Sequence, residues 1–201
     1  MDRQPRFERL TADQRREKLV EAGISCLSRH GIQGFTVDAI CQEASSSRGL
    51  IVHHFGSKDA LLAAVYAEVF QGLLAGLDTI GPEAVTPEAL VEGVLSGGFM
   101  DRKYLNVWLA LWGEIAVNPA MQDEHRKLNA RFRERLAMSL NRMAARDGKT
   151  IDSYRAAILL ISLADGLWLQ QCIDPSLLAA DRAKEHCLNV VKAVLSGGLV
   201  P

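Results

Sequence analysis

The sequence lacks the features that would mark an enzyme, a secreted protein or a membrane protein. No apolar run approaches the roughly 18–20 residues needed to cross a bilayer, and the segment from Met1 to Leu19 has too many charged residues for a signal peptide. There is no Gly-rich phosphate loop after a strand, no Ser/His/Asp order with an elbow motif and no cluster of metal ligands. We therefore expect a cytoplasmic protein that is not an enzyme, has no cofactor and contacts no membrane.

Cysteine is scarce and unpatterned, and the four thiols show neither C-x-x-C pairing nor a histidine at ligand spacing: Cys26, Cys41, Cys172 and Cys187. In a cytosolic protein such residues are usually reduced, so we expect buried free thiols and no metal site. The adjacent His53 and His54 do not change this expectation. Neighbouring residues on a helix point about 100° apart and cannot readily bind one metal together.

Net charge is also nearly absent, at −1 for 201 residues. A protein that coats nucleic acid without specificity would need a large positive charge, although a local basic face remains possible. Arginine and lysine are slightly in excess within the first 18 residues. That pattern is more often a solvated face than a DNA-binding arm.

β-like alternation and internal repeats are missing as well, and a helical pattern takes their place. The first helix is marked by apolar residues at helical spacing: Leu19, Ala22, Gly23, Cys26 and Leu27. Thr11 and Gln14 form a capping-box pair at its start, and Gly31 is a natural stop. The pattern predicts a helix over about residues 11–30.

Two short helices should follow the first one. Thr36 can cap the amide of Ala39 and begin a helix over about 36–44, with Phe35 and Ile40 at the positions of a hydrophobic staple. Three serines then interrupt the pattern, and a third helix ends at about residue 55. Ser57 is placed to cap a long fourth helix that reaches about residue 77.

Further helices are expected at about 87–100, 103–117, 120–146, 152–172 and 175–195. The predicted fold is therefore all-α, with about nine helices. Residues 1–57 would form a three-helix N-terminal domain, and residues 58–201 would form a larger helical domain for ligand binding and dimerisation.

The two short helices and the turn between them have the form of a helix-turn-helix, whose second helix lies in the DNA major groove. Ile51 and Phe55, four residues apart, can pack inward. The side chains left pointing mostly outward are Ser47, Arg48, Leu50, Val52 and His53. Arg48 could contact guanine or a phosphate, and Leu50 or Val52 could contact a thymine methyl group.

Lys58 lies at the start of the fourth helix, where the positive end of the helix dipole disfavours a cation. With the capping Ser57, it could form an anion site that binds a DNA phosphate. The alternative is that neighbouring Asp59 offsets the charge and that nothing binds.

The segments from Phe35 to Ala44 and from Lys58 to Leu62, with Ser47-Arg48-Gly49 and His53-His54-Phe55 between them, resemble the N-terminal domain of TetR-type transcriptional regulators. The resemblance implies a homodimer in which each N-terminal domain binds one half of a palindromic operator in double-stranded DNA. The residues expected at the DNA face are Thr36, Ser46, Ser47, Arg48, Leu50, Val52, His53 and Lys58.

Two positions depart from the usual TetR pattern. Most relatives have Gly-Val in the turn where this chain has Ser45-Ser46, and a tyrosine where it has Val52. The turn geometry is therefore less certain from sequence, and a phenol that could reach a phosphate is missing.

Tryptophan and one carboxylate mark the larger domain. Trp108 and Trp112 are four residues apart, and Asp165 and Trp168 are three apart, so each pair shares a helix face. Tryptophan faces beside a carboxylate can bind a quaternary ammonium group by cation–π attraction and charge pairing. The alternative is that the tryptophans pack the core or a dimer interface. Asp165 needs a partner in either case, because its surroundings in sequence are almost entirely apolar.

The motifs Val107–Trp112 and Asp165–Leu169 resemble the C-terminal domain of BetI-type regulators over about residues 87–196. The named member of that group represses genes that convert choline to glycine betaine and responds to choline. The resemblance implies a small-molecule effector and a dimer formed through the helices at 152–172 and 175–195. A non-cationic effector, or a domain that only dimerises or binds a protein partner, remains an alternative.

Overall fold

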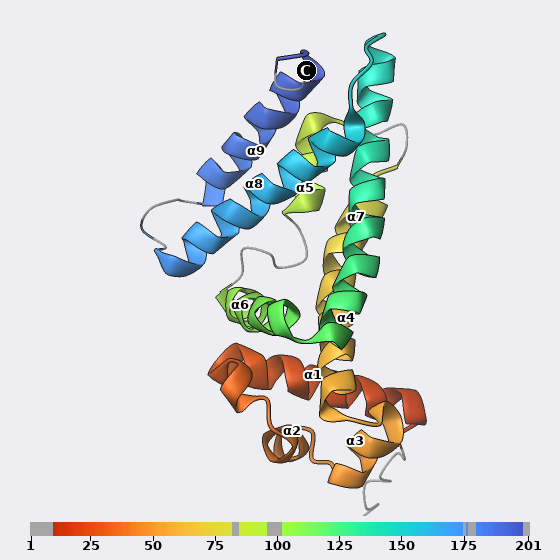
Figure 1. The fold of residues 1–201 in the computed structure, drawn as a ribbon, viewed down its shortest axis with the longest axis vertical. Helices are drawn as coiled ribbons and strands as arrows, with labels where there is room; N and C mark the ends of the chain where they lie inside the picture. The colour runs from red at the N-terminus through yellow and green to blue at the C-terminus, as the bar shows by residue number, and fades with distance from the viewer. Residues whose placement is uncertain (1–9, 82–84, 96–101, 175, 177–179, 199–201) are drawn as a thin grey trace, which may run out of the picture.

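A computed structural model of the chain describes residues 10–81, 85–95, 102–174, 176 and 180–198. Within these residues the fold is all-α, with nine α-helices and one short 3₁₀ turn (Figure 1). The elements in chain order are α1 (Ala12–His30), η1 (Ile32–Gly34), α2 (Val37–Glu43), α3 (Arg48–Phe55), α4 (Lys58–Asp78), α5 (Pro87–Val94), α6 (Arg102–Val117), α7 (Pro119–Arg146), α8 (Ser153–Ile173) and α9 (Ala180–Leu195).

The helix starts predicted from capping residues are confirmed. Thr11 and Gln14 form the capping box of α1, and the hydroxyl of Thr36 accepts a hydrogen bond from the amide of Ala39 at 3.2 Å. Ser57 caps α4 in the same way through the amide of Ala60, at 3.1 Å. These caps satisfy backbone donors that a helix start leaves unpaired.

One helix end differs from the predicted one, and one predicted helix start falls mostly outside the described residues. The predicted helix over 87–100 ends at Val94, and residues 96–101 lie outside the described part of the chain. The predicted helix over 175–195 is described only from Ala180 onward. The arginine-rich residues 1–9 also lie outside the described residues.

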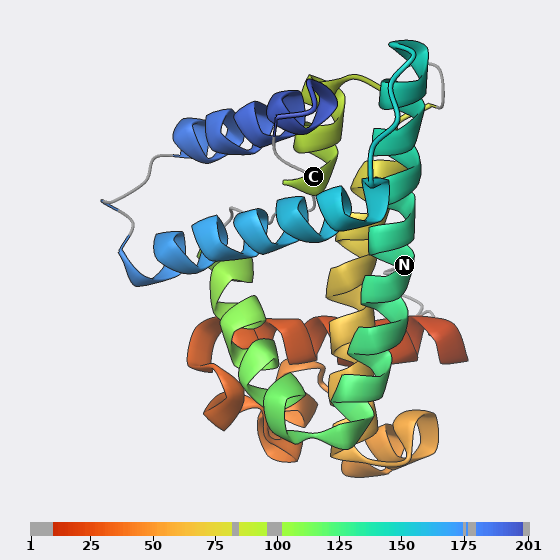
Figure 2. The same cartoon turned by 45° about the horizontal axis from the view of Figure 1, so that its top comes forward.

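The long helix α4 connects the two parts of the molecule. It begins beside α3 in the N-terminal bundle of α1–α3 and runs along α7 (Figure 1). α6 crosses over α1, and α8 and α9 run side by side at the far end (Figure 2). One hydrophobic cluster of the described residues extends from Leu19 and Ile51 to Trp168, so the N-terminal bundle and the larger domain share a continuous core.

Two helices are more apolar than the sequence reading indicated. By length and composition α4 and α8 could each cross a membrane, so the expectation that no run approaches this length was wrong. Core helices of globular proteins meet the same criterion, and half of the apolar window of α4 is buried inside the fold. Apolar length therefore gives no argument for a membrane here.

The cysteines are all free, but only two match the expected burial. Cys26 and Cys187 are buried, whereas Cys41 and Cys172 are half-buried. Burial raises the pKa of the Cys187 thiol to about 11, which keeps this thiol protonated and unreactive near neutral pH.

Candidate DNA-binding surface and effector cavity

The second helix of the helix-turn-helix, α3, is anchored by a single fully buried side chain, Ile51, at 2% exposure. Phe55 is half-buried, and the guanidinium of Arg16 lies over its ring at 5.2 Å. Arg48 and His53 are exposed, and Val52 is 63% exposed. The short helix thus presents one face to solvent, as groove binding requires.

Two of the eight predicted DNA-facing residues are less exposed than expected. Leu50 is half-buried and packs on the core cluster, and Ser46 is also half-buried. Both border a small hollow of about 120 Å³ next to Leu19 of α1. The prediction that Leu50 points mostly outward was therefore wrong, because α1 passes close enough to shield it. Thr36, Ser47 and Lys58 are exposed, as expected.

Arg48 does not extend freely into solvent. Its Nη2 atom lies 2.6 Å from Oδ1 and 2.7 Å from Oδ2 of Asp38, which is on α2. Both side chains are about 70% exposed, at 71% and 70%. Exposed ion pairs contribute little to stability, typically about 0–1 kcal/mol, so Arg48 can exchange this carboxylate for a DNA phosphate or base at low cost.

The serine-rich turn adopts the geometry that usually calls for glycine. Ser45 has a φ of 48°, the one positive value among the non-glycine residues that the structure describes. The amide of Ser46 bonds to the carbonyl of Cys41 at 2.8 Å, which closes the end of α2. A side chain in this left-handed region costs free energy, so the departure at Ser45-Ser46 keeps the turn but strains it.

Lys58 occupies the first position of α4 and is exposed. In the described part of the chain it forms no ion pair, and Asp59 does not neutralise it by direct contact. The cation therefore lies at the capped start of α4, three residues after the end of α3.

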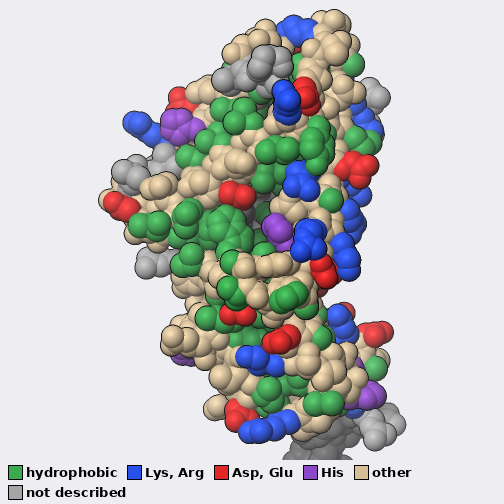
Figure 3. Space-filling view, viewed as in Figure 1, with side chains coloured by type: hydrophobic (Ala, Val, Ile, Leu, Met, Phe, Trp, Pro, Cys, Tyr) green, Lys and Arg blue, Asp and Glu red, His purple; other side chains and the backbone are tan. Residues whose placement is uncertain are grey.

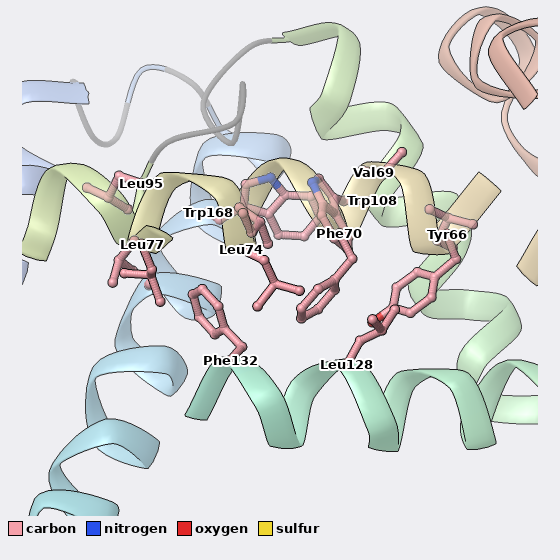
Figure 4. Packing of buried hydrophobic residues seen from close by; sticks show 14 of the residues in the cluster. Tyr66, Val69, Phe70, Leu74, Leu77, Leu95, Trp108, Leu128, Phe132 and Trp168 are labelled. Carbon is pink, nitrogen blue, oxygen red and sulfur yellow. The ribbon is translucent and has the colours of Figure 1, made fainter. Parts of the chain in front are cut away.

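A cavity of about 370 Å³ lies between α4, α6, α7 and α8. The four residues predicted for a ligand site all line it: Trp108, Trp112, Asp165 and Trp168. The rings of Trp112 and Trp168 are 4.7 Å apart between centroids, and Trp108 packs edge-on against Phe70 at 6.0 Å. Figure 4 shows Phe70 of α4 directed toward Phe132 of α7. The cavity wall is thus largely aromatic.

Asp165 supplies a carboxylate to this aromatic wall. No hydrogen bond or ion pair reaches it from any residue that the structure describes. Burial raises its pKa to about 6, because the charged form loses water without gaining a partner. The described residues therefore compensate the charge of this carboxylate poorly.

Sequence reasoning missed three polar residues of the cavity: Tyr66, His125 and Asn129. The Tyr66 hydroxyl and the Nδ1 atom of His125 are hydrogen-bonded at 2.8 Å. Burial lowers the pKa of His125, and the positive charge of Arg133 lowers it further. The imidazole is therefore neutral near pH 7, and among the described residues that line the cavity Asp165 alone carries charge there. His125 and Asn129 lie four residues apart on α7, a spacing that could have grouped them, whereas Tyr66 lies on α4 and no local pattern joins it to them.

Family models match both parts of the chain. Residues 19–65 match the family described as bacterial regulatory proteins, tetR family. Residues 86–196 match the family described as BetI-type transcriptional repressor, C-terminal. The chain belongs to the TetR family. It is a transcriptional regulator with a BetI-type C-terminal domain, and its relatives are not enzymes.

Curated relatives of this TetR-family regulator carry the name HTH-type transcriptional regulator BetI. The one from Burkholderia mallei is 30% identical over 165 residues, which cover 78% of this chain and 80% of that protein. The one from Vibrio parahaemolyticus is 30% identical over 182 residues, with coverage of 85% and 86%.

Solved structures share the fold. A putative transcriptional regulator from Pseudomonas aeruginosa PAO1 is 36% identical, with a TM-score of 0.78 and coverage of 96% of each chain. A putative transcriptional regulator from Saccharomonospora viridis, solved in complex with choline, is 23% identical with a TM-score of 0.72, and the match covers 90% of this chain and 96% of that one. The second likeness concerns the fold alone.

Proposed function

We propose that this TetR-family protein is a cytoplasmic homodimeric repressor that releases a palindromic operator when a quaternary ammonium compound, such as choline, enters the cavity. The observation that carries the proposal is the half-buried carboxylate of Asp165, which lines an aromatic cavity and has no partner among the described residues. A carboxylate that is shielded from water needs a partner for its charge, and without one its pKa rises. A cationic ligand would supply that partner.

The aromatic rings favour the same class of ligand. A quaternary ammonium group carries its charge on methyl groups and cannot donate a hydrogen bond, so aromatic faces and a carboxylate suit it better than hydrogen-bond acceptors do. Each favourable cation–π contact contributes about 0.5–2 kcal/mol. Of the three tryptophans that line the cavity, Trp112 is half-buried, whereas Trp108 and Trp168 are 4% and 0% exposed and would meet a ligand only after a local shift of the wall. The name of the curated relatives and the choline bound to the Saccharomonospora viridis protein support this choice.

Ligand binding can reach the DNA surface through α4. Tyr66 and Phe70 of this helix line the cavity, and its first residue, Lys58, is at the predicted DNA face. In a dimer formed through α8 and α9, the two copies of α3 must lie about 34–36 Å apart to enter successive major grooves. A ligand that favours another tilt of α4 changes this spacing and weakens operator binding.

The test combines two measurements on the purified protein. Choline chloride is titrated while tryptophan fluorescence is recorded, and a gel shift with DNA from around the protein's own gene is repeated with and without choline. 3,3-Dimethylbutanol, the uncharged carbon analogue of choline, is the matched control ligand. Footprinting of the shifted band gives the operator and shows whether it is a palindrome.

We expect choline to change the fluorescence and release the DNA, and the uncharged analogue to do neither at the same concentration. Equal responses to both compounds would show that charge is not recognised. An unaltered gel shift at saturating choline would overturn choline as effector and would favour a non-cationic effector or a domain that only dimerises.

A further inference from the structure

A hydrogen bond joins the wall of the cavity to the DNA-binding bundle without passing through α4. The Nδ2 atom of Asn106, on α6, donates to the backbone carbonyl of Ser28, on α1, at 3.2 Å. The two helices cross closely at this point (Figure 2). Asn106 is exposed, so hydrophobic burial does not explain where its side chain lies. The hydrogen bond fixes α1 to α6.

On the α6 side, this bond lies next to the cavity. Trp108 follows two residues later and Trp112 one further turn along, and both line the cavity. Leu105 and Val107, which flank Asn106, are 8% and 0% exposed. This part of α6 is therefore held in the core on one face while Asn106 contacts α1 on another, so a shift of the tryptophans moves Asn106 with them.

On the α1 side, the same helical turn holds α2. Ser25 donates a hydrogen bond from its hydroxyl to Oε1 of Glu43 at 2.9 Å, and Arg29 forms an ion pair with the same carboxylate. Hydrogen bonding to Arg29, and then to Ser25, lowers the pKa of Glu43. Ser28 lies between these two residues in sequence. A displacement of α1 at Ser28 is therefore passed to α2, the first helix of the helix-turn-helix.

The junction has room for such a displacement. A hollow of about 810 Å³ opens between α1, α2, α4 and α6, and its lining includes Ser25, Glu43 and Tyr104. A change of the angle between α1 and α6 can be taken up on this side without overlap of packed side chains.

We propose that Asn106 is a positioning residue that couples the cavity to the helix-turn-helix through α1, in parallel with α4. The proposal rests on the proposed function, because it concerns how ligand binding in that cavity alters DNA binding. It makes the Asn106–Ser28 hydrogen bond a determinant of allosteric coupling and assigns it no part in ligand affinity.

The first experiment measures coupling as the ratio of operator Kd values with and without saturating choline. Asn106→Asp retains the shape of the side chain and replaces the donor by an oxygen that repels the carbonyl, while Asn106→Ala removes the contact. Ser28→Ala is the matched control, because the bond uses the backbone carbonyl and not the serine hydroxyl. Choline affinity is measured separately by tryptophan fluorescence.

We expect both Asn106 variants to bind choline with the wild-type Kd. Their coupling ratio should be about two- to tenfold smaller than that of the wild type, the range that one hydrogen bond contributes. Ser28→Ala should match the wild type. Wild-type coupling in both Asn106 variants would overturn the proposal while leaving the proposed function intact.

A second experiment needs no effector. Hydrogen–deuterium exchange of the ligand-free protein is compared in the segments 25–31 and 37–43. We expect faster exchange there in Asn106→Asp than in Ser28→Ala, with α8 unchanged. If the wild type does not respond to choline, the proposed function fails. The exchange data alone then test the role of the Asn106–Ser28 hydrogen bond, and equal exchange in the two variants rejects that role.

Discussion

At the scale of single residues, Asp165 and Ser45 both occupy positions that cost the folded protein free energy. Asp165 holds a carboxylate in a largely aromatic cavity without a partner among the residues that the structure describes, and Ser45 holds a side chain at a positive φ. The sequence indicated both, the first as an acidic residue in an apolar run and the second as a departure from Gly-Val. It could not show how burial and backbone angle would act on them, since both depend on neighbouring helices.

For Asp165 we predict opposite effects on stability and ligand binding. Its pKa is about 6 in the folded chain against an ordinary value of 3.8, so the folded state binds the proton more tightly than the unfolded state. This stabilising contribution is complete below pH 3.8 and is lost as the pH rises through about 6. Asp165→Asn should therefore raise the melting temperature at pH 7.5, with a smaller gain at pH 4.5.

Calorimetry at both pH values checks this prediction. The difference between wild type and variant isolates Asp165, because His125 titrates in both proteins. A variant less stable than the wild type at pH 7.5 would show that a protein group already compensates the carboxylate.

Choline binding should follow the ionised fraction of the same carboxylate. With a pKa of about 6, the wild-type Kd should be about tenfold weaker at pH 5 than at pH 7.5, since only about a tenth of the carboxylate is then ionised. Fluorescence titration of wild type and Asp165→Asn measures this. The variant should bind weakly at both pH values, and a similar pH dependence in both proteins would point to His125 as the titrating group.

Ser45→Gly should stabilise the protein by up to about 1 kcal/mol, because glycine adopts a positive φ without steric cost. Denaturant unfolding measures the change. Ser46→Gly is the matched control: Ser46 has no positive φ, so glycine there should be neutral or destabilising. A gain at Ser46 equal to that at Ser45 would refute the strain assigned to the turn.

At the scale of elements, helix starts were the most predictable features, and side-chain exposure was the least. Caps act between residues two or three apart, so Thr11, Thr36 and Ser57 could be assigned from sequence alone. The half-burial of Leu50 depends on α1, and the ion pair of Arg48 depends on α2. The sequence pattern of α3 alone carries no information about where α1 and α2 lie.

Lys58 provides a test of the DNA-binding surface at this scale. If it contacts one phosphate, Lys58→Ala should reduce the slope of log Kd against log salt by about one, because one fewer counterion is released. Operator affinity is measured from low to moderate salt by fluorescence anisotropy. Lys127→Ala, which removes an exposed lysine from α7, is the control and should leave the slope unchanged. An unchanged slope in Lys58→Ala would remove this residue from the DNA face.

At the scale of the whole molecule, the cavity combines residues of four helices, and the proposed dimer surface would combine the outer faces of α8 and α9. Trp108, Trp112, Asp165 and Trp168 could be grouped from sequence because each pair shares a helix. Tyr66 and His125 could not, since their hydrogen bond joins α4 to α7 across 59 positions in sequence. The residues that line the cavity come from one chain, so we expect a single copy to bind the ligand, whereas the proposed palindromic operator would need two.

The dimer surface should therefore be separable from the cavity. In the space-filling view the side chains over α8 are largely hydrophobic (Figure 3). Leu159 of this helix is 38% exposed, and Leu163 and Leu167 continue its stripe into an apolar hollow beside Val190 of α9. Stripes of this kind favour helix pairing between subunits. We expect Leu159→Lys to give a monomer that keeps its helical content and its choline Kd.

Operator affinity should fall by about a hundredfold or more in Leu159→Lys, because two linked half-site contacts become independent ones. Analytical ultracentrifugation, circular dichroism and the gel shift measure these three properties together. Leu109→Lys is the matched control, since Leu109 is 50% exposed on α6 and carries the same change away from α8 and α9. A Leu159→Lys protein that stays dimeric would place the dimer contact on another surface. A monomer that retains full operator affinity would instead show that each helix-turn-helix acts alone, and the spacing between the two copies of α3 could then not be the quantity that the effector controls.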